Sequence, residues 1–159
     1  MLGGIGVDLG AIRYEYPGNT GDPGDDIDKW DTTEAYLGIG YGPLTYKFSR
    51  VMSKSWFGTQ EQKGAKYHDL GIALDLSEQT TLKAHAGFTK FKGEAKIADY
   101  KDYSLGIAHS LPQDFSVALT YYKNSFKGEY KALLDAALAA GSTKEVWKNA
   151  VVISLSKTF

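Results

Sequence analysis

The residues of this sequence that could carry out chemistry are its histidines and its carboxylates. The histidines, His68, His85 and His109, have no metal-ligand spacing such as a pair on one helical turn. The chain has no cysteine, which excludes a disulfide scaffold, a thiol nucleophile and a thiolate metal site. A serine nucleophile with a histidine base has one candidate region, around Ser55 and His68. We therefore expect a protein that is not an enzyme, with no cofactor and no metal, and keep a lipid-directed enzyme as an alternative.

A second group of carboxylates lies in the stretch 17–31. It contains five aspartates, Asp22, Asp25, Asp26, Asp28 and Asp31. Clustered carboxylates can hold calcium, but the glycine and the terminal glutamate of an EF-hand loop are missing here. The stretch is therefore predicted to be a solvated surface loop.

The elements that must position these side chains are alternating segments with a period of two, which is typical of strands. Short connections at 42–44, 77–79 and 112–114 alternate with long ones. This spacing predicts an all-β fold, an up-and-down antiparallel transmembrane β-barrel with tight turns at one rim and loops at the other. The eight predicted strands are 3–16, 32–42, 45–57, 66–76, 80–92, 102–111, 115–126 and 147–159.

One face of these strands is apolar, and the other mixes Gly, Ala and Ser with charges. In 80–92, for example, Leu82 and Phe88 alternate with Lys83 and His85. A soluble barrel would expose the glycines and alanines to water, where they weaken strands, so we expect the apolar face to meet lipid. The polar face would then line the lumen, where its charges could form ion pairs or line a channel. The candidate lumen-lining residues are Glu34, Lys47, Asp69, Asp75, Lys83 and His85.

Aromatic residues in the apolar phase gather towards both rims. Two aromatic girdles around an aliphatic band are what the two interfaces of a bilayer select. The alternative is that aromatic residues are simply common at strand ends. The candidate girdle residues are Tyr41, Tyr46, Phe115 and Phe159 at the turn rim, and Trp56, Tyr103, Tyr121 and Trp147 at the long-loop rim.

Three places depart from the alternation. The apolar phase changes within 3–16, which predicts a bulge near Ala11. Arg50 falls in the apolar phase, so we expect either a phase slip that turns it inward or a position close to the interface. The last long connection is helical, with Gly141 as its C-cap, and could fold over the barrel mouth, enter the lumen or lie on the membrane. A short helix packed on its own rim is the plain interpretation.

The composition fits one domain, 1–159, because the chain of 159 residues can bury a sizeable core. Its net charge of −1 offers no basic footprint for nucleic acid. No stretch approaches the roughly 18–20 apolar residues of a membrane helix, and the first residues lack the pattern of a secretory signal. Any export signal is therefore expected outside this sequence.

The end of the chain resembles a known signal. A closing strand that ends in Phe159 resembles the C-terminal signal that the barrel-assembly machinery reads in bacterial outer-membrane barrels, although Lys157 departs from the usual residue two before the end. The stretches DLGAIRYEYPG, DTTEAYLGIGYGPLTYKFS, DYKDYSLGIAHSL and SKTF resemble the proteobacterial TorF-type porin family over nearly the whole chain.

This resemblance implies an outer-membrane location and passive diffusion of small polar solutes. It also implies a family barrel of about twelve strands, of which this chain would be the C-terminal part. The implied partners are outer-membrane lipids, lipopolysaccharide and the barrel-assembly machinery, with an oligomer possible. The open alternatives are a small plugged barrel with a structural or surface-interaction role, and a soluble, lipocalin-like binding barrel.

Overall fold

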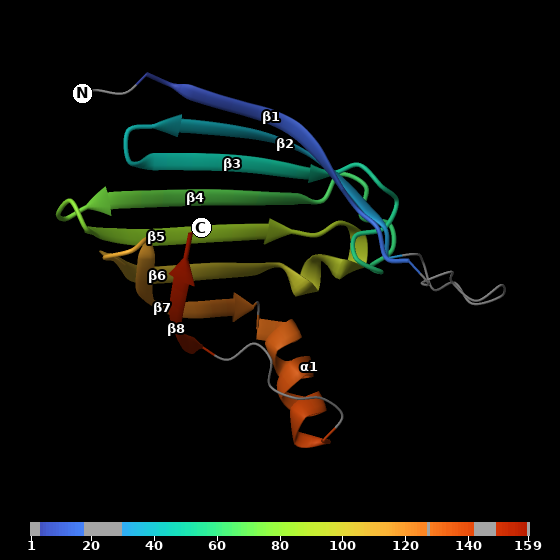
Figure 1. Ribbon diagram of the computed structural model, residues 1–159. Helices are drawn as coiled ribbons and strands as arrows, with labels where there is room; N and C mark the ends of the chain where they lie inside the picture. The colour runs from blue at the N-terminus through green and yellow to red at the C-terminus, as the bar shows by residue number, and fades with distance from the viewer. Residues whose placement is uncertain (1–3, 18–29, 127, 142–148, 159) are drawn as a thin grey trace.

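The computed structural model describes residues 4–17, 30–126, 128–141 and 149–158. The fold is all-β, with one antiparallel sheet in the sequential order β1 to β8 (Figure 1). Coiling of the sheet turns β8 across the direction of β2 to β5 (Figure 1). The strands are β1 (Gly6–Tyr14), β2 (Thr32–Tyr41), β3 (Leu44–Val51), β4 (Lys66–Asp75), β5 (Thr80–Lys90), β6 (Tyr100–Leu111), β7 (Phe115–Phe126) and β8 (Ala150–Lys157).

Tight turns fix the neighbouring strands at one rim, as the sequence predicts. Gly42, in the β2–β3 turn, has a φ of +55°, a backbone conformation that glycine adopts without steric cost. The longer connections lie at the opposite ends of the strands. These include a 3₁₀ helix, η1 (Gly93–Ala98), and an α-helix, α1 (Gly128–Ala139), after which Gly141 adopts a φ of +68°.

The two faces of the sheet differ in chemistry and in burial. Residues that lie opposite each other on neighbouring strands point to the same face of the sheet. Leu9 and Leu37 form such a pair on the apolar face, and Asp69 and Gly87 form one on the polar face. Two hydrophobic side chains, Val51 and Ala65, are buried in the described part of the chain. The buried residues within strands all lie on the polar face: Thr32, Ser49, Val51, Gly87, Thr89 and Gly106.

The apolar face, by contrast, is open. Leu9 is 78 % exposed and Ile153 is 75 % exposed. The helix α1 contacts η1 and projects beyond the end of β7 instead of lying over a face of the sheet (Figure 1). No second layer of the described chain therefore covers the apolar side chains. Within the described ranges no helix is long and apolar enough to span a membrane.

Two expected irregularities are absent from the register. The pairing of β1 with β2 runs without interruption from Gly6 to Tyr14, so the predicted bulge near Ala11 is wrong. Tyr14 lies on the polar face, where its ring packs edge-on against Phe57 at 5.1 Å, and this contact explains the apolar residue in the polar phase. The pairing of β2 with β3 is equally regular, so no phase slip turns Arg50 inward.

Arg50 instead stays in the apolar phase of its strand. It lies on the apolar face at the end of β3, opposite Lys66, the first residue of β4, with its guanidinium beside Gly64. The predicted strand 45–57 was also too long, because β3 ends at Val51. There the chain turns, and the backbone N–H of Met52 donates to the carbonyl of Thr33 at 2.8 Å.

Candidate functional site

The centre of the polar face holds a histidine between two aspartates from neighbouring strands. His85 Nδ1 lies 2.9 Å from Asp69 Oδ1, and His85 Nε2 lies 2.6 Å from Asp102 Oδ1. The hydroxyl of Tyr67 donates to Asp102 Oδ1 at 3.1 Å. These contacts join β4, β5 and β6 across the middle of the face, and we call the four residues the His85 network.

The geometry of the His85 network defines its chemistry. A neutral imidazole donates from one ring nitrogen alone, so two bonds to carboxylates require an imidazolium or a protonated carboxyl group. Neither ring nitrogen keeps a free lone pair for a metal ion, and the described residues contain no group of ligands suited to a metal. In either state His85 bridges the carboxyl groups of Asp69 and Asp102 and so links three neighbouring strands.

Glycine at position 87 makes room for the His85 network. A Cβ atom at Gly87 would overlap both the hydroxyl of Tyr67 and the carboxylate of Asp102. Gly87 lies opposite Asp69 on one neighbouring strand and opposite Asp102 on the other. Because Gly87 has no side chain, the space over its backbone is free for the contacts of His85 and Tyr67 with these acids. This is one reason for the small residues that alternate with charges on the polar face.

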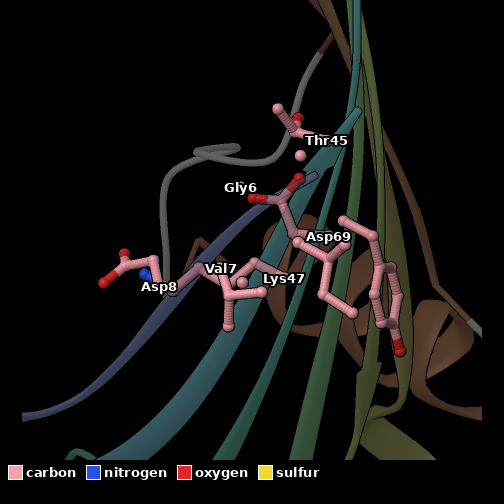
Figure 2. Close-up of a pocket in the computed structure, with 10 residues that line it drawn as sticks. Gly6, Val7, Asp8, Thr45, Lys47 and Asp69 are labelled. Carbon is pink, nitrogen blue, oxygen red and sulfur yellow. The ribbon is translucent and has the colours of Figure 1, made fainter. Parts of the chain in front are cut away.

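A second polar group lies closer to the β1 edge. The Lys47 ammonium lies 4.1 Å from the centre of the Tyr36 ring, a cation–π distance, and the Tyr36 hydroxyl donates to Asp8 at 3.4 Å. A groove of about 410 Å³ opens here, and Figure 2 shows Asp8, Lys47 and Asp69 around it, contributed by β1, β3 and β4. Two glycines from β2, Gly38 and Gly40, also line this groove and keep it open.

The loop after β3 folds over the long-loop end of the polar face. The indole N–H of Trp56 donates to Glu34 Oε1 at 2.7 Å, and its ring packs against Phe91 at 5.0 Å. Gln62, which is 1 % exposed, accepts a bond from the backbone N–H of Lys92 at 2.8 Å and so ties this loop to the one after β5. This tethered loop therefore covers part of the polar face at its long-loop end.

All six candidate lumen-lining residues lie on the polar face. The structure brings His85 and Asp69 together in the His85 network, Lys47 over Tyr36, and Glu34 against Trp56. Asp75 accepts a bond from the hydroxyl of Thr81 at 2.8 Å at the turn end. Within the described chain Lys83 has no ion-pair partner. It faces the same side as these groups, opposite Gly106.

Two members of the His85 network, Tyr67 and Asp102, were missed by the sequence reasoning. Counting from the short turn at 77–79 places Asp69 opposite Gly87, which is the register observed. The connection between β5 and β6 is long and does not fix a register, so the sequence gives no means to align Asp102 with them. The available signal was weaker: both residues fall in the polar phase.

The candidate girdle residues divide into three groups. Tyr41 and Phe115 lie on the apolar face beside the turns, and Tyr46 lies one outward position further from that rim. Tyr103 and Tyr121 lie on the apolar face towards the long loops. Trp56 is not on the apolar face, because it belongs to the loop bonded to Glu34. Trp147 and Phe159 fall outside the described residues.

The remaining candidates occupy separate places. His68 lies on the apolar face, where its Nδ1 is 2.7 Å from the Tyr46 hydroxyl, whereas Ser55 is buried in the loop after β3. His109 also lies on the apolar face and contacts the hydroxyl of Thr80 at 2.9 Å. Most of the acidic stretch 17–31 lies outside the described residues, but Asp31 accepts a bond from the backbone N–H of Tyr16 at 2.9 Å.

Comparison with known proteins places the chain in a family. A family model described as "Bacterial protein of unknown function (Gcw_chp)" matches residues 1–159. The chain belongs to the Gcw_chp family. No curated protein and no solved structure matches it. The family description assigns no activity to Gcw_chp proteins.

Proposed function

We propose that this Gcw_chp protein forms the wall of a bacterial outer-membrane β-barrel and that its polar face lines a lumen through which small polar solutes diffuse. The observation that carries the proposal is the inverted distribution of side chains. Buried strand residues lie on the polar face, while residues such as Leu9 and Ile153 lie exposed on the other. A continuous apolar face of this size needs a covering, and hydrocarbon is a covering that requires no second protein layer.

The length of the strands supports a membrane-spanning sheet. They contain from 8 to 12 residues. A strand that crosses a bilayer at a tilt of about 45° needs about 9–11 residues.

The positions of the turns support the tilt. The β6–β7 turn meets β7 at Phe115, six residues before Tyr121. A row of register partners leads from the β2–β3 turn to this residue through Leu44, Ile72, Ala84, Leu105 and Tyr121. Six residues correspond to about 20 Å along the strand direction, and the four strand spacings from β3 to β7 correspond to about 19 Å across the sheet. If the turns lie at one rim, these two lengths give the strands a tilt of about 45°. Strands of outer-membrane barrels tilt by about 35–45°.

Closure is part of the proposal. The edges of the sheet are β1 and β8, which do not pair with each other in the described chain. In lipid the unpaired N–H and C=O groups of an open edge cost several kcal/mol each, so both edges need partners. Pairing of β1 with β8 would give eight strands, whose interior is just filled by side chains, and further strands would give a wider lumen.

A plugged barrel with a structural role is the second candidate. The His85 network and the tethered loop at Trp56 favour it, because both fill the polar side with bonded side chains. Ions would then meet a packed interior instead of a continuous water column.

Single-channel conductance in planar bilayers tests the proposal and separates the two candidates. The acids of the described strands, Asp8, Glu34, Asp69, Asp75 and Asp102, share the polar face with three basic side chains, Lys47, Lys83 and His85. We therefore expect unitary steps with a preference for cations, because fixed charges of one sign raise the local concentration of counter-ions.

The expected selectivity has a matched control. Replacing Asp8 and Asp75 by Asn should reduce the cation preference, whereas Lys157→Gln, on the apolar face, should leave it unchanged. A barrel that shows heat-modifiable gel mobility but no unitary steps would support the plugged candidate. A protein that stays monodisperse without detergent and does not insert would contradict both and favour the soluble binding barrel.

A further inference from the structure

The long-loop end of the apolar face carries a row of basic side chains. The row consists of one exposed residue from each of five consecutive strands, and we call it the basic belt: Arg50, Lys66, Lys90, Lys101 and Lys123. Arg50 lies opposite Lys66, which lies opposite Lys90, so three of these cations are direct cross-strand neighbours. Like charges in such positions destabilise a sheet unless an anion lies between them.

Among the described residues, one acid neutralises a cation of the basic belt. Lys90 pairs with Asp99 at 3.1 Å, and Lys101 lies 5.8 Å from the centre of the Phe88 ring. Arg50, Lys66 and Lys123 have no ion-pair partner among the described residues. The five acids within the described strands all lie on the opposite, polar face. Apart from Asp99, which pairs with Lys90, no acid of the described chain is paired with a cation of the basic belt.

Each cation of the basic belt has a ring-bearing residue next to it on the same strand and the same face. One outward position closer to the turn rim, every one of the five strands has an aromatic or imidazole ring. The ring and cation pairs are Phe48 with Arg50, His68 with Lys66, Phe88 with Lys90, Tyr103 with Lys101, and Tyr121 with Lys123. Aliphatic residues such as Ile72 and Leu119 continue the same face beyond the rings.

The order aliphatic, ring, cation repeats the order of a bilayer from its hydrocarbon to its headgroups. Rings prefer the interfacial depth, and lysine and arginine reach the level of the phosphates. From β5 to β6 the position of the basic belt shifts by two residues towards the tight-turn rim. It shifts by two more residues in the same direction from β6 to β7. The turns step in the same sense, so the apolar band lies between two oblique boundaries, as it does on tilted strands in a slab of lipid.

We propose that the basic belt binds the phosphate groups of anionic lipids in the leaflet at the long-loop rim. This inference rests on the proposed membrane barrel and adds the chemistry of its lipid partner. A phosphate placed between Arg50 and Lys66 would form charge-assisted hydrogen bonds to both and remove their repulsion. Charge complementarity, together with the ring beside each cation, identifies a phosphorylated lipid headgroup as the occupant.

The test compares vesicles of phosphatidylcholine with and without phosphatidic acid, whose headgroup is a phosphate monoester. The readout is the thermal midpoint at which the folded gel band of the full chain disappears. For the unmodified chain, phosphatidic acid should raise this midpoint. In the double variant Arg50→Gln, Lys66→Gln the amount of phosphatidic acid needed for half of the shift should rise at least about fivefold, since each cation near an anionic surface contributes about that factor.

A matched control removes the same charge elsewhere. Lys131→Gln with Lys157→Gln, in α1 and at the turn end of β8, should keep the response of the unmodified chain. Equal responses of the two double variants would overturn the proposal, as would an equal shift caused by inorganic phosphate added to neutral vesicles. A chain that folds in neutral vesicles but does not respond to phosphatidic acid contradicts the basic belt alone. Failure to fold in any vesicle contradicts the membrane barrel itself.

Discussion

Leu105→Arg should destabilise the vesicle-inserted protein by about 2–4 kcal/mol, the cost of a cation on the lipid face at mid-bilayer. Leu105 is 54 % exposed on the apolar face, midway along β6 between Lys101 and the β6–β7 turn. In a soluble protein such an exposed leucine could be replaced at a cost of about 0.5 kcal/mol or less. The denaturant midpoint of the folded gel band in vesicles gives the difference.

Leu111→Arg is the matched control for this effect. Leu111 lies on the same strand and the same face, is 39 % exposed, and is the last residue of β6. A charge at that depth can reach the headgroups, so we expect a cost of about 0–1 kcal/mol. Equal and small effects at the two positions would mean that the apolar face is not in contact with hydrocarbon.

Replacement of His85 by Leu should cost about 1–3 kcal/mol of stability, because it leaves two carboxylates of the polar face without their shared donor. The side chains of His85, Asp69 and Asp102 are 26 %, 36 % and 23 % exposed, so water offsets part of the loss and the full cost of a buried, unpaired charge does not apply. The same denaturant midpoint measures this change.

Two further variants identify the cause of the His85 effect. Asp69→Asn with Asp102→Asn, introduced into the His85→Leu protein, should recover most of the lost stability because the uncompensated charges are gone. His109→Leu removes a histidine from the apolar face and should be neutral or stabilising. A loss at His109 as large as that at His85 would show that histidine removal is harmful for reasons other than the lost bridge between Asp69 and Asp102.

Much of the fold could be predicted from the sequence because its strands alternate strictly. The period of two gave every strand of the sheet, and the short turns gave their order. The errors arose where tertiary contacts override the pattern. Tyr14 breaks the apolar phase to pack on Phe57, which imitates a bulge, and Trp56 continues the alternation of β3 although it belongs to a loop bonded to Glu34.

The candidate site was predictable by face but not by partner. Alternation placed His85 and Asp69 on the polar face, and the tight turn between β4 and β5 fixed their proximity. Asp102 comes from across a long connection, so its pairing depends on a register that no local signal specifies. The basic belt was missed for the same reason. Only Arg50 stood out in the sequence, as an exception, until the register aligned it with Lys66 and Lys90.

We expect the apolar face to meet lipid and the polar face to meet water. The chain contains no cysteine, so single cysteines can be placed along β6 from 103 to 108 and spin-labelled one at a time. The vesicle-inserted protein should show alternating accessibility. Labels at 103, 105 and 107 should collide with oxygen dissolved in lipid, and those at 104, 106 and 108 with a water-soluble nickel reagent or with neither. Preferential collision of the labels at 105 and 107 with the nickel reagent would show that the apolar face meets water and not lipid.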